Sequence, residues 1–98
     1  MSDSVMQDRR ECYATRATVG LDRHHVFKAS RRKASEEMGL WVWLRHDVHM
    51  AMHDHRPPWE ALEEALKAAA QRAWEESGGT RAEWMRRIGA NYLGGDAE

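Results

Sequence analysis

The 98-residue sequence has little cysteine, little proline and no long apolar run. Its single cysteine, Cys12, excludes an internal disulfide. No stretch is apolar enough to span a membrane, and the first residues lack the apolar core of a signal peptide. We therefore predict a cytoplasmic protein with no membrane partner. A chain of this length can bury a modest core as one small domain, and five tryptophans and six methionines supply bulky apolar material for it.

Charge is distributed unevenly along the chain, although the net charge is only -1. Residues 1–35 contain eight Lys and Arg against four Asp and Glu, whereas residues 36–98 contain seven against twelve. A basic first half could face phosphate groups while the acidic second half is solvated. Within the first half, residues 28–33 (KASRRK) form a basic run that is predicted to be a loop. A solvated loop is the commoner explanation of such a run, and a phosphate contact is the alternative that the neighbouring histidines favour.

The spacing of apolar residues predicts two strands and a short helix in the first half. Residues 21–27 are predicted to form the first strand, on which the neighbours His24 and His25 point to opposite faces. The second strand, residues 40–45, is apolar on both faces, so we expect both to be covered. Residues 47–54 are predicted to form a short helix.

Longer helices are predicted in the second half. Residues 59–77 carry an apolar stripe at helical spacing. After Gly78-Gly79, Thr80 and Glu83 form a capping-box pattern for a last helix that runs to about Leu93. Its inward residues are predicted to be Trp84, Met85, Ile88 and Tyr92. The fold class is therefore α+β, a small β-hairpin plus short helix followed by two packed C-terminal helices. The chain divides into a flexible lead (1–11), a core (12–56) and a helical hairpin packed on that core (57–98).

The six histidines all lie between His24 and His55. Histidines four residues apart, such as His49 and His53, present two imidazoles on one face of a helix, close enough to share a metal. A third ligand from a packed strand would leave positions for water or phosphate. The other strand histidine could stay off the metal and act as a base near neutral pH. Taken singly, each histidine is more often a surface or core residue; as a set, they can support hydrolysis.

The order of several short blocks resembles the HNH endonucleases, also called ββα-metal or His-Me finger enzymes, and especially small phage HNH-like proteins. The resemblance covers roughly residues 12–93 and implies metal-dependent cleavage of DNA with low sequence specificity. It implies His25 as the general base and a single divalent ion (Mg, Mn, Ni or Zn) held by His24, His49 and His53. It also places Lys28, Arg31, Arg32 and Lys33 on the nucleic-acid backbone. The matching blocks are Gly20-Leu21, His24-His25-Val26-Phe27, Arg32-Lys33-Ala34-Ser35-Glu36, Gly39-Leu40, His49 and the tail 84–93.

Two features depart from the family pattern. The asparagine of the HNH name has no match on the second strand, where Leu40, Trp41 and Val42 stand. The relatives also hold a structural zinc with two Cys-x2-Cys knuckles, and one thiolate cannot make such a site. We therefore expect no structural zinc and a core stabilised by packing instead. Natural decay or redesign into a zinc-free protein would both give this pattern, and the idealised helix 60–76 favours redesign. The four degenerate positions are Cys12, Thr15, Arg45 and Val48.

Two alternatives to the endonuclease remain open. One is a catalytically inactive or engineered zinc-free scaffold that could still bind nucleic acid weakly; it would show the same thermal midpoint with and without chelator. The other is a histidine metal site with different hydrolytic chemistry. His46 and His55 are predicted to be bystanders, although His55 could join a rearranged site. Base stacking by Trp41 or Trp43 is a lesser alternative to a role in the core. No feature of the sequence fixes the oligomeric state.

Overall fold

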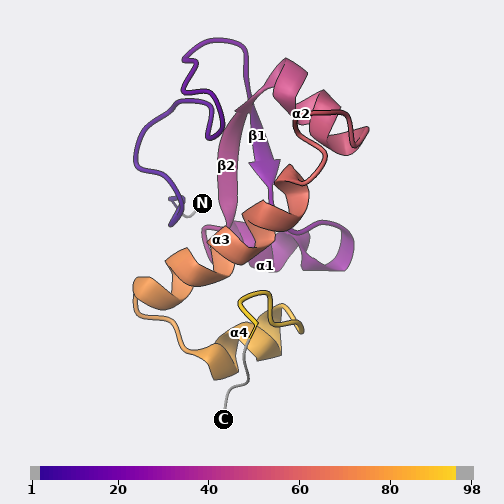
Figure 1. Ribbon diagram of the computed structural model, residues 1–98. Coiled ribbons are helices and arrows are strands. Elements are labelled where there is room, and N and C mark those ends of the chain that lie inside the picture. The colour runs from indigo at the N-terminus through magenta and orange to yellow at the C-terminus, as the bar shows by residue number, and fades with distance from the viewer. Residues whose placement is uncertain (1–2, 95–98) are drawn as a thin grey trace.

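The computed structural model describes residues 3–94. It is an α+β structure, as predicted, with a two-stranded antiparallel hairpin followed by packed C-terminal helices (Figure 1). Within these residues no helix combines the length and the apolar character that crossing a membrane requires. In chain order the elements are β1 (Leu21–His25), the 3-10 helix η1 (Ala29–Arg31), α1 (Arg32–Glu37), β2 (Trp41–Arg45), α2 (His46–His53), α3 (Leu62–Glu76) and α4 (Arg81–Arg87).

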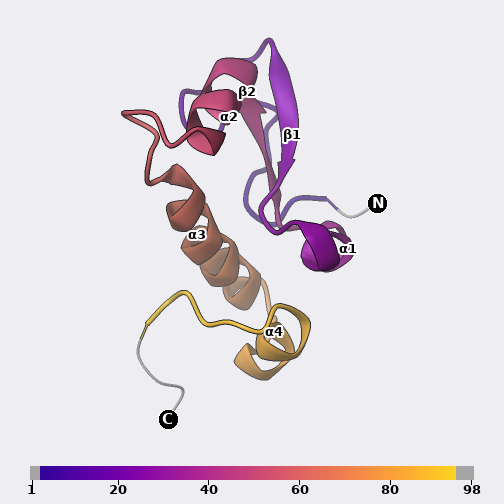
Figure 2. The same cartoon turned by 90° about the vertical axis from the view of Figure 1, so that its right-hand side faces the viewer.

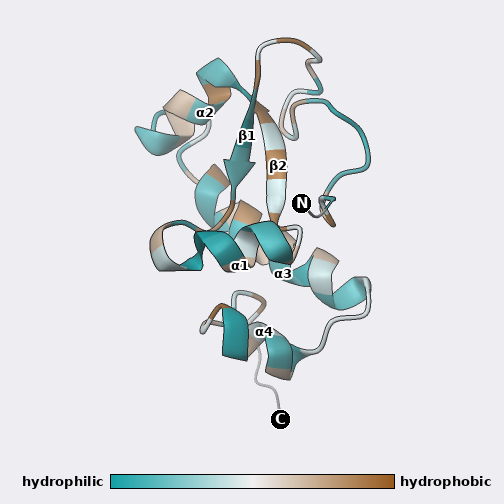
Figure 3. Cartoon of the chain, turned by 180° about the vertical axis from the view of Figure 1, so that it is seen from behind, coloured by the Kyte–Doolittle hydropathy of each residue, from teal (hydrophilic) through white to brown (hydrophobic). Residues whose placement is uncertain are grey.

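The hairpin places different helices on its two faces. In the register of β1 and β2, His24 lies opposite Val42 and His25 lies opposite Trp41. Successive side chains of a strand alternate between faces, so His24 and His25 are directed apart. Figure 2 shows α2 and α3 on one side of the hairpin and α1 on the other. In Figure 3, β1 is hydrophilic and β2 is more hydrophobic, so polar side chains of β1 reach both faces.

Several residues of segment 3–11, which is predicted to be a flexible lead, form hydrogen bonds with β2 and the residues beside it. Trp43 N donates a hydrogen bond to Gln7 Oε1 (2.8 Å), and Ser4 Oγ donates to the carbonyl oxygen of Trp41 (2.6 Å). Val5 N donates to the carbonyl oxygen of Gly39 (2.9 Å). Gly39 has φ +76, and a Cβ there would collide with the backbone of residue 3. The polar side chains of Ser4 and Gln7 therefore attach this segment to β2.

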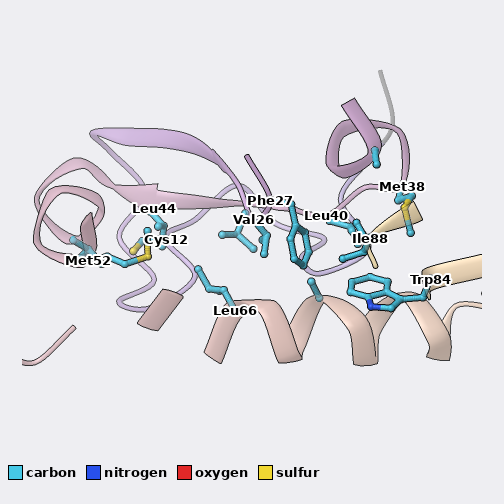
Figure 4. Close-up of a cluster of buried hydrophobic side chains, with 14 residues drawn as sticks. Cys12, Val26, Phe27, Met38, Leu40, Leu44, Met52, Leu66, Trp84 and Ile88 are labelled. Atoms are coloured by element: carbon cyan, nitrogen blue, oxygen red, sulfur yellow. The ribbon is translucent and has the colours of Figure 1, made fainter. Parts of the chain in front are cut away.

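A single core lies between the hairpin and α3. Figure 4 shows Leu66 of α3 directed at the side chains of the hairpin, with Phe27 and Trp84 further along the helix. The rings of Phe27 and Trp84 are 5.6 Å apart, centroid to centroid. Packing of this kind provides most of the favourable free energy of folding. Side chains with less than 2% exposure include Cys12, Val26, Leu40, Val42, Leu44, Met52, Leu66 and Trp84.

The C-terminal helices are shorter than the sequence pattern predicts. Residues 56–61 form turns, in which Trp59 N donates to the carbonyl oxygen of Arg56 (2.8 Å), so α3 begins at Leu62 instead of residue 59. At the start of α4, Thr80 accepts a hydrogen bond from Glu83 N, as the capping box predicts. The helix ends at Arg87, well before Leu93. Its buried face is narrow, and Met85, predicted to point inward, is 40% exposed.

The chain after α4 is held on α3 by a buried amide. Gln71 is fully buried, and its Oε1 accepts a hydrogen bond from Tyr92 N (2.6 Å). Its Nε2 donates to the side chain of Asn91 (3.0 Å). A buried amide with both ends bonded fixes the path of its partners strongly, because breaking either bond would leave a desolvated polar group. This bonding stops α4 from continuing and returns residues 91–92 to the core.

The HNH resemblance assigns a degenerate zinc site to four positions, of which Cys12 is fully buried. Val48 is buried in the same core, whereas the side chain of Arg45 is exposed and pairs with Asp47 (3.2 Å). Thr15 is also exposed. Burial raises the pKa of Cys12, but hydrogen bonds from the backbone of Arg45 and from Thr15 outweigh it, and the pKa lies below the usual value. Packing and hydrogen bonds thus hold the Cys12 side chain in place.

The contribution of α4 to folding can be measured directly. Trp84→Ala removes a fully buried ring and should lower the free energy of unfolding by about 3–5 kcal/mol in a urea titration. Met85→Ala, one residue along and 40% exposed, is the matched control and should change it by no more than about 0.5 kcal/mol. Equal stability of the two variants would mean that α4 does not belong to the cooperative core.

Candidate metal centre

Three histidines from two elements meet beside the hairpin. His24 comes from β1, and His49 and His53 come from α2. Each offers one ring nitrogen such that the three nitrogens lie within 4.8 Å of one another. The ring centroids of His49 and His53 are 4.9 Å apart, and those of His24 and His49 are 5.1 Å apart. The three histidines therefore lie close enough to bind one metal ion.

The local sequence explains why these rings meet. The helix α2 follows β2 without a loop, and burial of Val48 and Met52 fixes its rotation about its own axis. The same rotation turns the i, i+4 pair His49 and His53 toward β1. There His24 occupies the strand face that α2 covers. The fold thus brings together the His49 and His53 pair predicted from the spacing and His24, which the HNH resemblance implies as the third ligand.

His24 is buried and lacks a hydrogen-bond partner at one nitrogen. The residue is 3% exposed, and its Nε2 has no partner among residues 3–94. Burial, with the charges of His49 and Lys28, lowers the pKa of His24 from 6.5 to about 3. It is therefore neutral at neutral pH, which is the form that binds metals. An unsatisfied buried group costs about 1–3 kcal/mol, and a bound cation would remove that cost.

Asp22 orients one of the three rings. Its Oδ2 accepts a hydrogen bond from His49 Nδ1 (2.9 Å), which leaves His49 Nε2 available for a metal. The same oxygen accepts from His46 Nδ1 (2.7 Å). The hydrogen bond from His49 lowers the pKa of Asp22, so the carboxylate is ionised. The sequence analysis did not identify Asp22, although its position two residues before His24, on the same strand face, is the signal that could have done so.

Lys28 lies against the third ring. Its Nζ is 3.2 Å from His53 Nδ1 and 3.4 Å from His53 Nε2, and it is 3.8 Å from a carboxylate oxygen of Glu63 on α3. Burial, followed by the charge of Lys28, lowers the pKa of His53. Nitrogens bound to one ion at about 2.0–2.1 Å would lie closer together than these do. Occupation of the site therefore requires small rotations of the rings and movement of Lys28 away from His53.

His25 lies outside the ligand set. Its Nε2 is 2.5 Å from Glu36 Oε1, on the face of the hairpin opposite the metal ligands. His25 still lines a hollow of about 280 Å³ together with His24, His49 and His53. A molecule in this hollow could therefore contact His25 and the three clustered histidines at once. The full lining is Arg23, His24, His25, Lys28, Arg32, His49 and His53.

The predicted nucleic-acid contacts divide into two groups. Lys28 and Arg32 line the hollow, whereas Lys33 lines a neighbouring one with His25 and Glu36. Arg31 lines neither, and it lies 3.7 Å from where a Cβ on Gly89 would stand. Within residues 3–94, no carboxylate lies within ion-pair distance of the three arginine and lysine side chains on η1 and α1. These exposed cations are Arg31, Arg32 and Lys33.

The other predicted residues lie apart from the centre. His46 shares Asp22 with His49 but is not one of the three clustered ligands. His55 is exposed and does not line the hollow. Trp41 is buried, which argues against base stacking by that ring. Comparison of the chain with protein-family models, curated proteins and solved structures finds no match.

The role of Asp22 predicts a loss of metal affinity. Asp22→Asn removes the charge that holds the His49 ring and should weaken Zn²⁺ or Ni²⁺ binding, measured calorimetrically, by about 10–100-fold. Asp47→Asn is the control. Asp47 is an exposed acid on α2, the helix that carries His49, and its partner is Arg45. Equal affinities of the two variants would remove Asp22 from any role in the metal site.

The burial of His24 predicts a pH dependence of stability. Because the pKa of His24 falls from 6.5 in the unfolded chain to about 3 on folding, the unfolded state binds more protons between these values. Its contribution to stability is complete above pH 6.5 and declines as the pH falls toward 3. In chelator, the free energy of unfolding should fall by about 3 kcal/mol between pH 7 and pH 4.

A non-titrating residue at position 24 tests this assignment. His24→Gln should remove most of the pH dependence, whereas His55→Asn, which replaces an exposed histidine, should leave it unchanged. Urea titrations at several pH values measure the effect. An unaltered slope in His24→Gln would assign the pH dependence to other groups, of which His53 is the nearest whose pKa is also lowered.

Proposed function

We propose that the chain is a metal-dependent endonuclease that cleaves DNA phosphodiester bonds with low sequence specificity. The observation that carries this proposal is the shared hollow of about 280 Å³, which His25 lines together with the three clustered histidines. The HNH resemblance implies the same three histidines as metal ligands and adds His25 as the base. The clustering of the three histidines supports this ligand set.

The three clustered histidines would hold one divalent ion. His24 contributes a buried, neutral ring whose Nε2 has no other described partner. His49 is oriented by Asp22, and His53 contributes from one helical turn further on. A divalent ion held by three protein ligands would act as a Lewis acid on the phosphate and the leaving oxygen. Three ligands leave coordination positions open for the substrate.

His25 would activate the attacking water. Its imidazole takes a proton from the water as the water oxygen attacks phosphorus. The bond between phosphorus and the leaving oxygen then breaks, and that oxygen is protonated from solvent. Because His25 and His24 are directed to opposite faces of β1, His25 can act as a base without binding the ion. The side chain of His25 is 12% exposed, so a water can reach it from the hollow.

The exposed cations on η1 and α1 would bind the phosphate backbone. Arg32 lines the hollow itself, and Arg31 and Lys33 extend the positive charge along the surface. Contacts to phosphate fix the position of DNA without reading its sequence. This supports cleavage with low sequence specificity and predicts binding that weakens as salt increases.

One observation favours the alternative of an inactive scaffold. The ammonium group of Lys28 lies 3.2 Å from His53 Nδ1, close to where an ion would bind. If the ammonium group of Lys28 occupied the place of the metal ion permanently, no ion could bind. The chain would then retain the fold and a weak affinity for nucleic acid without cleaving it. Metal binding separates the two functions, because the scaffold would show none.

Plasmid nicking tests the proposed function. We expect nicking with at least one of Mg²⁺, Mn²⁺, Ni²⁺ and Zn²⁺ and none in chelator. His25→Asn should reduce the rate by about 10²–10⁴-fold, since general-base catalysis contributes that much, while metal affinity stays nearly unchanged.

His55→Asn is the matched control for this test. His55 is exposed, has φ +54 and lies outside the hollow; asparagine tolerates that backbone conformation, so the variant should nick at the wild-type rate. A folded wild-type protein that binds metal but nicks with none of the four ions would refute the nuclease. Full activity of His25→Asn would remove His25 from the role of base.

A further inference from the structure

We propose that Glu36 positions His25, and that it does so by accepting a hydrogen bond from Nε2 and leaving Nδ1 free to take a proton. This inference rests on the proposed function for its catalytic meaning, but the contact itself is a feature of the fold. Glu36 lies on α1, at the opposite face of the hairpin from the metal ligands. The asparagine that the HNH pattern would place on the second strand is missing, and Glu36 approaches His25 from a helix instead.

The contact between the side chains of Glu36 and His25 is short and partly buried. Glu36 Oε1 lies 2.5 Å from His25 Nε2, and the side chains are 29% and 12% exposed. A short charge-assisted hydrogen bond of this kind is stronger than one between neutral groups. Partial burial protects it from competing water. The imidazole of His25 therefore has one preferred orientation.

Arg23 holds the carboxylate in place. One guanidinium nitrogen of Arg23 lies 3.2 Å from Oε1 and 3.0 Å from Oε2 of Glu36. The guanidinium in turn stacks on the ring of Trp41, 3.9 Å from its centroid. Arg23 and His25 are two residues apart on β1 and share a face. The contacts thus run from the buried Trp41 through Arg23 and Glu36 to His25, so packing in the core restricts the position of the ring.

The carboxylate decides which tautomer His25 adopts. A neutral imidazole carries one N–H, and an ionised carboxylate can only accept a hydrogen bond. The hydrogen bond from His25, with the charge of Arg23, holds the pKa of Glu36 below its usual value, so the group is ionised at neutral pH. The proton of neutral His25 therefore lies on Nε2, and Nδ1 carries the lone pair that a general base needs.

The structure also provides a matched control. Glu37 is the next residue on α1 and lines the same neighbouring hollow as Glu36 and His25. Its carboxylate pairs with Arg87 of α4 (2.6 Å), whereas the carboxylate of Glu36 contacts His25. Glu37→Gln therefore changes the local charge as Glu36→Gln does, without touching the base.

Imidazole ¹⁵N NMR of the full chain, without metal and in mildly alkaline buffer, reads the tautomer directly. We expect the wild type and Glu37→Gln to show His25 protonated at Nε2. In Glu36→Gln the side-chain amide can donate or accept, so both tautomers should be populated. A wild-type His25 protonated at Nδ1, or the same tautomer ratio in Glu36→Gln and Glu37→Gln, would overturn the proposal.

Nicking kinetics tests the catalytic meaning. Glu36→Gln should lower kcat at least about tenfold, within the range that a misoriented base can cost, with KM for DNA and calorimetric Zn²⁺ affinity unchanged. Glu37→Gln should match the wild type. Equal kcat in both variants would overturn the positioning role. If none of the four metal ions supports nicking by the wild type, the proposed function fails. The tautomer measurement then still decides whether Glu36 determines which nitrogen of His25 carries the proton.

Discussion

The alternation of side chains along β1 is the constraint on which the centre depends. Two adjacent histidines can serve different purposes because a strand directs one to each face. His24 meets α2 and its two histidines, whereas His25 meets Glu36 of α1. Their neighbours on β1 alternate in the same way, because Asp22 contacts His49 and Arg23 contacts Glu36. A slip of one residue in the strand pairing would exchange the two sets, so the register is itself part of the site.

The register depends on residues that carry no chemistry. Val42 and Leu44 of β2 are fully buried and fix which face of the hairpin receives α2 and α3. The first residues of the chain bond to β2, and Gln71 holds the chain after α4 on α3. Hydrophobic packing over a small core, supported by side-chain bonds to the backbone, therefore holds the hairpin in its register.

The sequence predicts the periodic parts of this structure and not the parts set by tertiary contacts. The spacing of His49 and His53 predicts a shared ligand pair, and alternation in the first strand predicts the divergence of His24 and His25. Polar residues near the N-terminus give no period, so their bonds to β2 could not be predicted. Asp22 and Glu36 acquire roles only when elements distant in sequence meet. Met85 fits the helical pattern, but α4 is too short to bury it.

The centre is costly while it lacks a ligand, and this cost links metal binding to stability. Three features lie close together in the centre. His24 is buried and neutral with an unsatisfied nitrogen, Asp22 orients the His49 ring, and the ammonium group of Lys28 lies beside His53. Binding of a cation would satisfy His24 but would repel Lys28, for which Glu63 is an available partner. Movement of Lys28 from His53 toward Glu63 would relieve this repulsion, so the position of Lys28 and occupation of the centre are linked.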